Sequence, residues 1–190
     1  DVSVVLQRIK SGATKDLIKK IRSEKNKKAR QDLKAQLPAI CFSGVFTKRN
    51  DSSIKEHSGL ICLDFDGYDK KKDMLQDKEK FTKDSYVYSV FISPSGNGLK
   101  VLVKIPQDPD NHVNYFNSLK RHFKNDHFDV TSKNISRVCY ESWDALIYIN
   151  ENSSVFDKIE EVEYKELHKF RDMPTIPITD ENRIVSILTT

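Results

Sequence analysis

Two aspartates, one residue apart, close a short apolar run in "LICLDFDGYD" at residues 60–69. Because residues i and i+2 of a strand point to the same face, we expect Asp64 and Asp66 to project together. Two neighbouring carboxylates repel each other, and a hard divalent cation such as Mg²⁺ relieves that repulsion. Mg²⁺ commonly brings substrate phosphates with it, so the pair predicts phosphate chemistry. The alternative is a pair of solvated turn residues.

A second candidate segment, "SPSGNGLK", spans residues 93–100 and has the composition of a hairpin turn. Gly96 and Gly98 permit positive φ angles and a close approach of a ligand to the backbone. Hydroxyl groups and an ammonium group beside such a turn would suit a nucleoside triphosphate. The expected nucleotide-binding residues of this segment are Ser93, Ser95, Gly96, Asn97, Gly98 and Lys100. The plainer alternative is a turn with exposed lysines, and the spacing is not that of a P-loop.

The segment "HFDVTSKNISRVCYESWD" could supply a third carboxylate. Asp129 follows a predicted helix and would complete an acidic cluster if its segment lies beside residues 60–66. Asp144 is the rival for this role. Arg137 is always charged and offers paired donors to a phosphate, so we expect it to bind nucleotide as well. The alternatives are a turn aspartate and a surface ion pair.

The elements that must position these residues follow from hydrophobic spacing. Residues 15–36 are predicted to be helical, from Thr14 as a cap to the stop at Pro38. This stretch carries the basic run Lys25, Lys27, Lys28 and Arg30, for which a solvated helix face is favoured over a phosphate contact.

Strands are predicted at residues 58–66, in a hairpin over residues 85–105, and in "SRVCYES" and "ALIYIN". A helix follows "PDNH", with Val113, Phe116, Leu119 and Phe123 as its buried face. This order predicts an α+β sandwich with a largely antiparallel sheet and helices on one side.

Composition sets broad limits on function. Of the 190 residues, 32% are charged and 37% hydrophobic, and the net charge is +4. This mild positive charge permits a nucleic-acid partner without requiring one. No apolar run is long enough for a membrane span, and the N-terminus lacks the order of a signal peptide, so we expect a cytoplasmic protein without a membrane partner. Three scattered cysteines, Cys41, Cys62 and Cys139, are expected to be free thiols.

Domain organisation is expected to change near residue 157. Residues 1–157 are predicted to form the catalytic domain. Residues 158–190 contain "MPTIPITDENR" and are predicted to be a linker or the start of a C-terminal extension.

Taken together, "LDFD", "SPSGNGLK" and "HFD" resemble the archaeo-eukaryotic primase superfamily, which has acids on one strand, a nucleotide-binding hairpin and a later acid. Over residues 30–150 the chain is more narrowly similar to the primase-like N-terminal domain of VirE-type replication proteins of phages and mobile elements. The resemblance implies an RRM-like antiparallel sheet with an N-terminal α/β unit beside it. Lys100 stands where the superfamily usually has histidine, a change that suits triphosphate binding better than a role for neutral imidazole.

The same resemblance implies a template-directed nucleotidyltransferase that uses Mg²⁺ or Mn²⁺. Asp64, Asp66 and Asp129 would be the catalytic and metal-binding acids. The implied partners are single-stranded DNA template and primer, nucleoside triphosphates and a helicase. Lys48, Arg49 and the basic helix would lie along the template.

Three rival functions stay open. The "DFDG" motif also suits a phosphohydrolase of the haloacid-dehalogenase type, although Tyr68 stands where that family usually has threonine. The domain could also be a catalytically silent module that binds single-stranded nucleic acid, or a regulator of an attached helicase.

Overall fold

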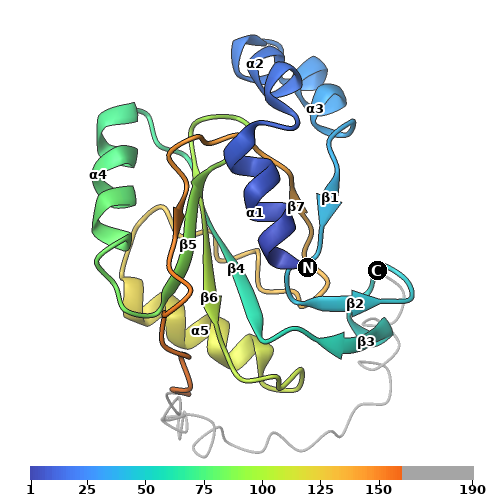
Figure 1. The fold of residues 1–190 in the computed structure, drawn as a ribbon, viewed down its shortest axis with the longest axis vertical. Helices are drawn as coiled ribbons and strands as arrows, with labels where there is room; N and C mark the ends of the chain where they lie inside the picture. The colour runs from blue at the N-terminus through green and yellow to red at the C-terminus, as the bar shows by residue number, and fades with distance from the viewer. Residues whose placement is uncertain (160–190) are drawn as a thin grey trace, which may run out of the picture. The chain divides into compact units, whose positions relative to one another are not determined.

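The strand that carries Asp64 forms one edge of the main sheet, and Asp66 follows directly after its end. A computed structural model describes residues 1–159. Its main sheet contains four antiparallel strands in the order β4-β6-β5-β8 (Figure 1). Their bounds are β4 Leu60–Phe65, β5 Val87–Ile92, β6 Leu99–Lys104 and β8 Tyr148–Ile149.

The two helices that follow strands of this sheet pack on the same face of it. Helix α4 (Lys71–Phe81) joins β4 to β5, β5 and β6 form the expected hairpin, and α5 (His112–Phe123) follows β6. Since β6 lies between β4 and β5, this is a split βαβ arrangement. After α5 the chain returns to the free edge of β4 through a single antiparallel bridge between Phe128 and Phe65. The predicted α+β class with an antiparallel sheet is confirmed.

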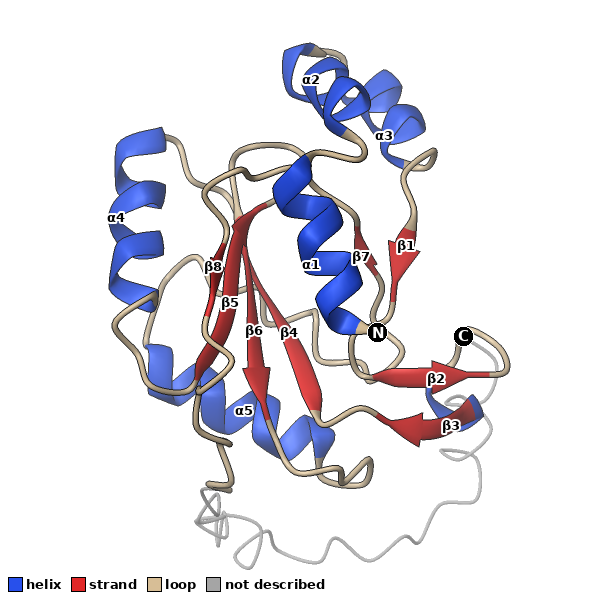
Figure 2. Cartoon of the chain, viewed as in Figure 1, coloured by secondary structure: helices blue, strands red, loops and turns tan. Residues whose placement is uncertain are grey.

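The side chains of β4 alternate between two hydrophobic cores, one on each face of the main sheet. Ile61, Leu63 and Phe65 face the larger core, which α4 and α5 cover. Leu60 and Cys62 face the opposite core, which α1 (Val2–Ser11) covers. The expectation of helices on one side only was therefore wrong. The reverse face of the sheet is also apolar for most of its length, and it needs its own cover (Figure 2).

The N-terminal unit rises above the end of the sheet where β4 terminates (Figure 1). It contains α2 (Lys15–Ser23) and α3 (Lys27–Lys34), with Asn26 capping α3 through its side chain. The predicted long helix is thus two helices, because Asn26 starts a new one. Ile18, Ile21 and Leu37 form the small core of this unit.

Short strands complete the fold. Strand β1 (Ala39–Ile40) pairs with β7 (Cys139–Tyr140), and β2 (Gly44–Phe46) pairs with β3 (Ile54–His57). A short 3-10 helix, η1 (Asp51–Ser53), precedes β3.

Helix α5 buries a face close to the predicted one. Phe116, Leu119 and Phe123 are buried as expected, but Val113 is 40% exposed, so its prediction was wrong. His112 and Tyr115 take its place, since they complete the helical spacing with the other three.

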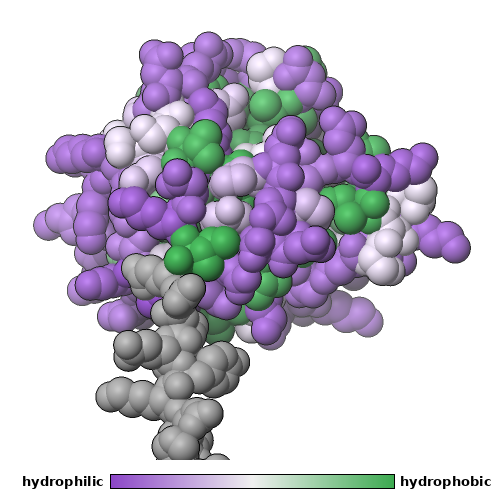
Figure 3. Space-filling view, turned by 90° about the horizontal axis from the view of Figure 1, so that it is seen from below, coloured by the Kyte–Doolittle hydropathy of each residue, from purple (hydrophilic) through white to green (hydrophobic). Residues whose placement is uncertain are grey.

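The face seen in Figure 3 is largely hydrophilic, and its hydrophobic side chains form small separate patches. All three cysteines are free, as predicted. Among the helices of residues 1–159, none combines the length and apolar character needed to cross a membrane. The expected linker lies outside the described residues from residue 160 onward.

Candidate active site

The acidic residues meet at the end of β4. Strand pleating directs Asp64 and Asp66 to one side, and backbone pairing brings Asp129 beside them. The N–H of Asp66 donates to the carbonyl of His127 (2.8 Å), and the N–H of Asp129 donates to the carbonyl of Asp64 (2.8 Å). A segment far along the chain therefore aligns with the end of β4 and delivers the third carboxylate.

One oxygen from each of Asp64, Asp66 and Asp129 lies within 4.8 Å of the others. Asp64 is buried, Asp129 is half-buried and Asp66 is exposed at the mouth. Protein atoms around the Asp66 carboxyl displace water, and this desolvation raises its pKa. The charge of Lys100 opposes the rise, and those of Asp64 and Asp129 add to it. Such mutual destabilisation of negative charge is what a bound cation would relieve.

Two protein cations already contact this cluster. The Lys100 Nζ lies 2.5 Å from Asp64 Oδ1, and both side chains are largely buried. The Arg137 guanidinium bridges Asp64 Oδ2 at 3.2 Å and Asp129 Oδ2 at 3.4 Å. Burial alone would lower the pKa of Lys100, but the charge of Asp64 acts against it and the net pKa is raised. The ammonium is therefore charged at neutral pH.

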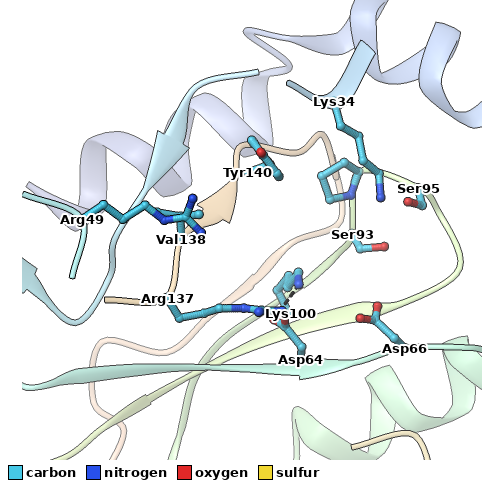
Figure 4. Close-up of a pocket in the computed structure, with 11 residues that line it drawn as sticks. Lys34, Arg49, Asp64, Asp66, Ser93, Ser95, Lys100, Arg137, Val138 and Tyr140 are labelled. Carbon is cyan, nitrogen blue, oxygen red and sulfur yellow. Dashed lines mark hydrogen bonds and ion pairs between the residues drawn. The ribbon is translucent and has the colours of Figure 1, made fainter. Parts of the chain in front are cut away.

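A cavity of about 290 Å³ opens beside the acids (Figure 4). Its walls come from β4, the β5–β6 turn, α3 and the segment around β7. The lining residues are Lys34, Arg49, Asp64, Asp66, Ser93, Pro94, Ser95, Lys100, Arg137, Val138 and Tyr140. Four cations and two of the acids thus share one concave site, as binding of an anionic ligand with a metal would require.

The β5–β6 turn has the conformation that its glycines allow. Gly96 adopts a left-handed backbone with φ of 81°. Gly98 does not use the positive φ that glycine permits. A Cβ at Gly98 would instead collide with the carboxylate of Asp66 and would lie 2.7 Å from the carbonyl oxygen of Phe65. Gly98 is therefore needed so that the acid can lie against the turn.

Ser93 places a buried hydroxyl without a partner at the start of this turn. Its side chain is buried, its hydroxyl has no hydrogen bond, and it points into the cavity (Figure 4). A buried hydroxyl without a partner is unfavourable. Arg22 of α2 fixes the backbone nearby by donating to the carbonyls of Ser93 (3.2 Å) and Trp143 (2.9 Å). The turn is thus held in place while the Ser93 hydroxyl is left for a ligand.

Tyr68, Asp77 and His127 form a polar and aromatic cluster that contacts the backbone of Asp66. The ring of Tyr68 stacks on His127 with 3.7 Å between centroids, and the Tyr68 hydroxyl donates to Asp77 (2.7 Å). His127 Nδ1 donates in turn to the carbonyl of Asp66 (3.0 Å). The N–H of Tyr68 donates to the carbonyl of Asn97 (3.2 Å), which ties this cluster to the turn.

The rival third acid has a structural role. Asp144 is buried, its Oδ2 lies 2.5 Å from Lys78 Nζ, and it also accepts from the N–H of Ile92 (2.9 Å). The structure therefore groups Asp129, and not Asp144, with the first two acids.

The predicted site residues otherwise converge. Ser93, Ser95, Lys100 and Arg137 line the cavity, while Asn97 lines a neighbouring groove. Sequence reasoning missed Lys34, which reaches down from α3 towards the cavity (Figure 4). Burial lowers the pKa of Lys34, and the nearby Asp66 partly offsets this effect. Lys34 lies seven residues after Lys27 on the same helical face, and this spacing could have identified Lys34 from the sequence.

The donor set fits a hard divalent cation. Three carboxylates are within reach of a common point, and Mg²⁺ and Mn²⁺ favour oxygen ligands of this kind.

Comparison with known proteins identifies a family. Residues 32–149 match the model of the family described as "BT4734-like, N-terminal domain". No curated protein and no solved structure matches the chain.

Proposed function

The chain belongs to the BT4734-like N-terminal domain family, and we propose that it is a template-directed nucleotidyltransferase, a DNA primase or polymerase. The observation that carries the proposal is the approach of three carboxylates to within 4.8 Å beside a cavity with four cations. The resemblance of the three motifs to the archaeo-eukaryotic primase superfamily supports the same activity, in replication of a phage or mobile element.

The metal requirement follows from the acids. Asp64, Asp66 and Asp129 would hold Mg²⁺ or Mn²⁺. When bound, such ions would lower the pKa of an attacking hydroxyl and offset the charge of a leaving pyrophosphate. Backbone hydrogen bonds between residues 64–66 and 127–129 hold these carboxylates side by side, and so would set where the ions bind.

The protein's own donors would hold the triphosphate. Lys100 has three N–H donors and gives one to Asp64, so two are left for phosphate oxygens. Arg137 has five donors and contacts one oxygen of each of two acids, which leaves further donors for the ligand. Ser93 adds its unpartnered hydroxyl. Transfer of a nucleotidyl group depends mainly on such positioning and charge stabilisation.

The implied partners are single-stranded DNA with a primer, nucleoside triphosphates and a helicase, in the cytoplasm. Two rival functions share the fold: a silent binding module and a regulator of a helicase. A third, a phosphohydrolase, would use the same acids differently.

Primer extension separates these functions. The wild-type protein, Asp64→Ala/Asp66→Ala and the control Asp69→Asn are incubated with Mg²⁺ or Mn²⁺, a labelled primer on a template and all nucleotides. Asp69 is exposed and outside the acidic cluster. We expect extension by the wild type and the control, and none by the double variant.

Each rival predicts a different result. DNA binding without extension by any of the three proteins would favour the silent module. Absence of DNA binding at low salt would favour the regulator, because electrostatic affinity is greatest there. Phosphate release from an aryl phosphate, lost in the double variant, would favour the phosphohydrolase.

A further inference from the structure

A second groove continues from the cavity along α3. It has a volume of about 230 Å³ and lies between α3 and the β5–β6 turn. Its lining residues are Lys27, Arg30, Gln31, Lys34, Asp66, Ser95 and Asn97. Lys34, Asp66 and Ser95 also line the cavity, so the two hollows adjoin at these residues. A ligand lying in the groove would therefore lead directly to the acids.

The basic residues on and just before α3 fall into two sets. Lys27, Arg30 and Lys34 recur at intervals of three and four residues, so they lie on one helical face and line the groove. Lys25 and Lys28 belong to the same run but do not line it. Lys25, Lys27 and Lys28 are exposed, as a solvated face predicts, and Lys27 and Arg30 also line the groove.

The groove-lining cations have no carboxylate at ion-pair distance within the described residues. None of Lys27, Arg30 and Lys34 forms an ion pair with a carboxylate in residues 1–159, in contrast to Lys100 and Arg137. Helix α3 contains no fully buried residue, and its packing relies on the half-buried Leu33. Three cations without an ion pair make this wall of the groove positive, although Asp66 also lines the groove and acts on Lys34.

We propose that this groove binds the phosphodiester backbone of a single nucleic-acid strand as the strand passes the acids; the role of the acids rests on the function proposed above. The helical rise spreads Lys27 and Lys34 over about 10 Å along the helix axis. A row of cations of that length follows an extended strand better than a compact triphosphate. The triphosphate donors Ser93, Lys100 and Arg137 lie in the adjoining cavity and do not line the groove.

Two double variants with the same loss of charge test the proposal. Lys27→Gln/Arg30→Gln removes two cations from the groove, and Lys25→Gln/Lys28→Gln removes two from outside it. Glutamine has nearly the helix propensity of lysine and arginine, so both variants should fold, and circular dichroism checks this. Lys34 is left intact because it also lines the cavity. The probe is a fluorescent oligo-dT of about 20 nucleotides, titrated over about 50 to 200 mM salt.

We expect the groove variant to bind oligo-dT about tenfold more weakly. The slope of log affinity against log salt should become shallower by about 1.4, since each phosphate contact on a single strand contributes about 0.7. The control variant should keep the wild-type slope. Equal losses in the two variants, or no binding of oligo-dT by the wild type, would overturn the proposal. A loss of triphosphate affinity alone in the groove variant would overturn it too, because the groove would then hold the triphosphate.

The two proposals can fail separately. Strand binding that depends on the groove without primer extension would remove the polymerase and keep the groove. Primer extension with equal strand affinity in both double variants would keep the polymerase and remove the groove.

Discussion

The Lys100 ammonium lies 2.5 Å from the carboxylate of Asp64, inside the cluster that would hold a metal ion. Lys100 is thus a cation built into the site, paired across adjacent strands because Asp64 and Lys100 are register partners on β4 and β6. It offsets part of the negative charge of the acids. A divalent ion approaching Asp64 must therefore either displace this ammonium or bind beside a positive charge.

Lys100→Met should strengthen Mn²⁺ binding by the protein without nucleotide by about tenfold or more, because it removes charge repulsion close to the metal. The same change should weaken triphosphate binding. Mn²⁺ titration followed by calorimetry or electron paramagnetic resonance measures the first effect.

Lys104→Met is the matched control, since Lys104 lies on the same strand but contacts the carbonyls of Glu151 and Ser153. It should leave Mn²⁺ affinity unchanged. Unchanged or weaker Mn²⁺ binding by Lys100→Met would show that the ammonium does not compete with the metal.

Ser93→Ala should make the protein without ligand more stable and should lower its affinity for triphosphate. The Ser93 hydroxyl is buried without a partner, so its removal should raise the free energy of unfolding by about 1 kcal/mol. Triphosphate affinity should fall about five- to tenfold, because the donor is lost. Chemical denaturation and nucleotide titration measure the two effects. Ser95→Ala, at a half-buried position, should not gain stability; a loss of stability in Ser93→Ala would contradict this account.

Asp129→Asn and Asp144→Asn should have opposite effects on Mn²⁺ affinity and on stability. Asp129→Asn should weaken Mn²⁺ binding at least tenfold with little change in stability, since one of three carboxylates is neutralised. Asp144→Asn should keep Mn²⁺ affinity but lose about 3 kcal/mol of stability, because the buried Lys78 loses its charged partner. Metal titration and denaturation of both variants provide the test. The reverse pattern would make Asp144 the third acid.

Stability should fall as the pH drops below 6.5, because of a buried histidine pair. His57 Nε2 lies 3.2 Å from His112 Nδ1, and both rings are buried. Burial and the charge of His57 lower the pKa of His112 from 6.5 to about 4, although Asp51 acts against them. Burial also lowers the pKa of His57, opposed by Asp108.

Because the unfolded chain binds protons first, this stability is present above pH 6.5 and is lost as the pH falls towards 4. Between pH 7 and about 4.5, wild-type protein should lose roughly 2 to 3 kcal/mol more than His112→Gln. Denaturation series at both pH values measure the difference, and equal losses would rule out the pair as its source.

The sequence by itself determined most of what depends on local periodicity. Alternation along residues 60–66 fixed the shared side of Asp64 and Asp66 and the opposite side of Leu63 and Phe65. The turn composition located the hairpin, and helical spacing located most of the buried face of α5. These features depend on residues close together in the sequence, because the local backbone conformation sets the direction of each side chain.

Only the tertiary structure decided which distant residues meet. Asp129 joined the acids because its segment pairs with the edge of β4, whereas Asp144 turned to Lys78. Lys34 reached the site because α3 lies over the hairpin turn, and Gly98 proved to be needed by the carboxylate of Asp66. Periodicity tells which way a side chain points along its own element, but the partner across a fold is chosen by long-range pairing and packing, which no local pattern records.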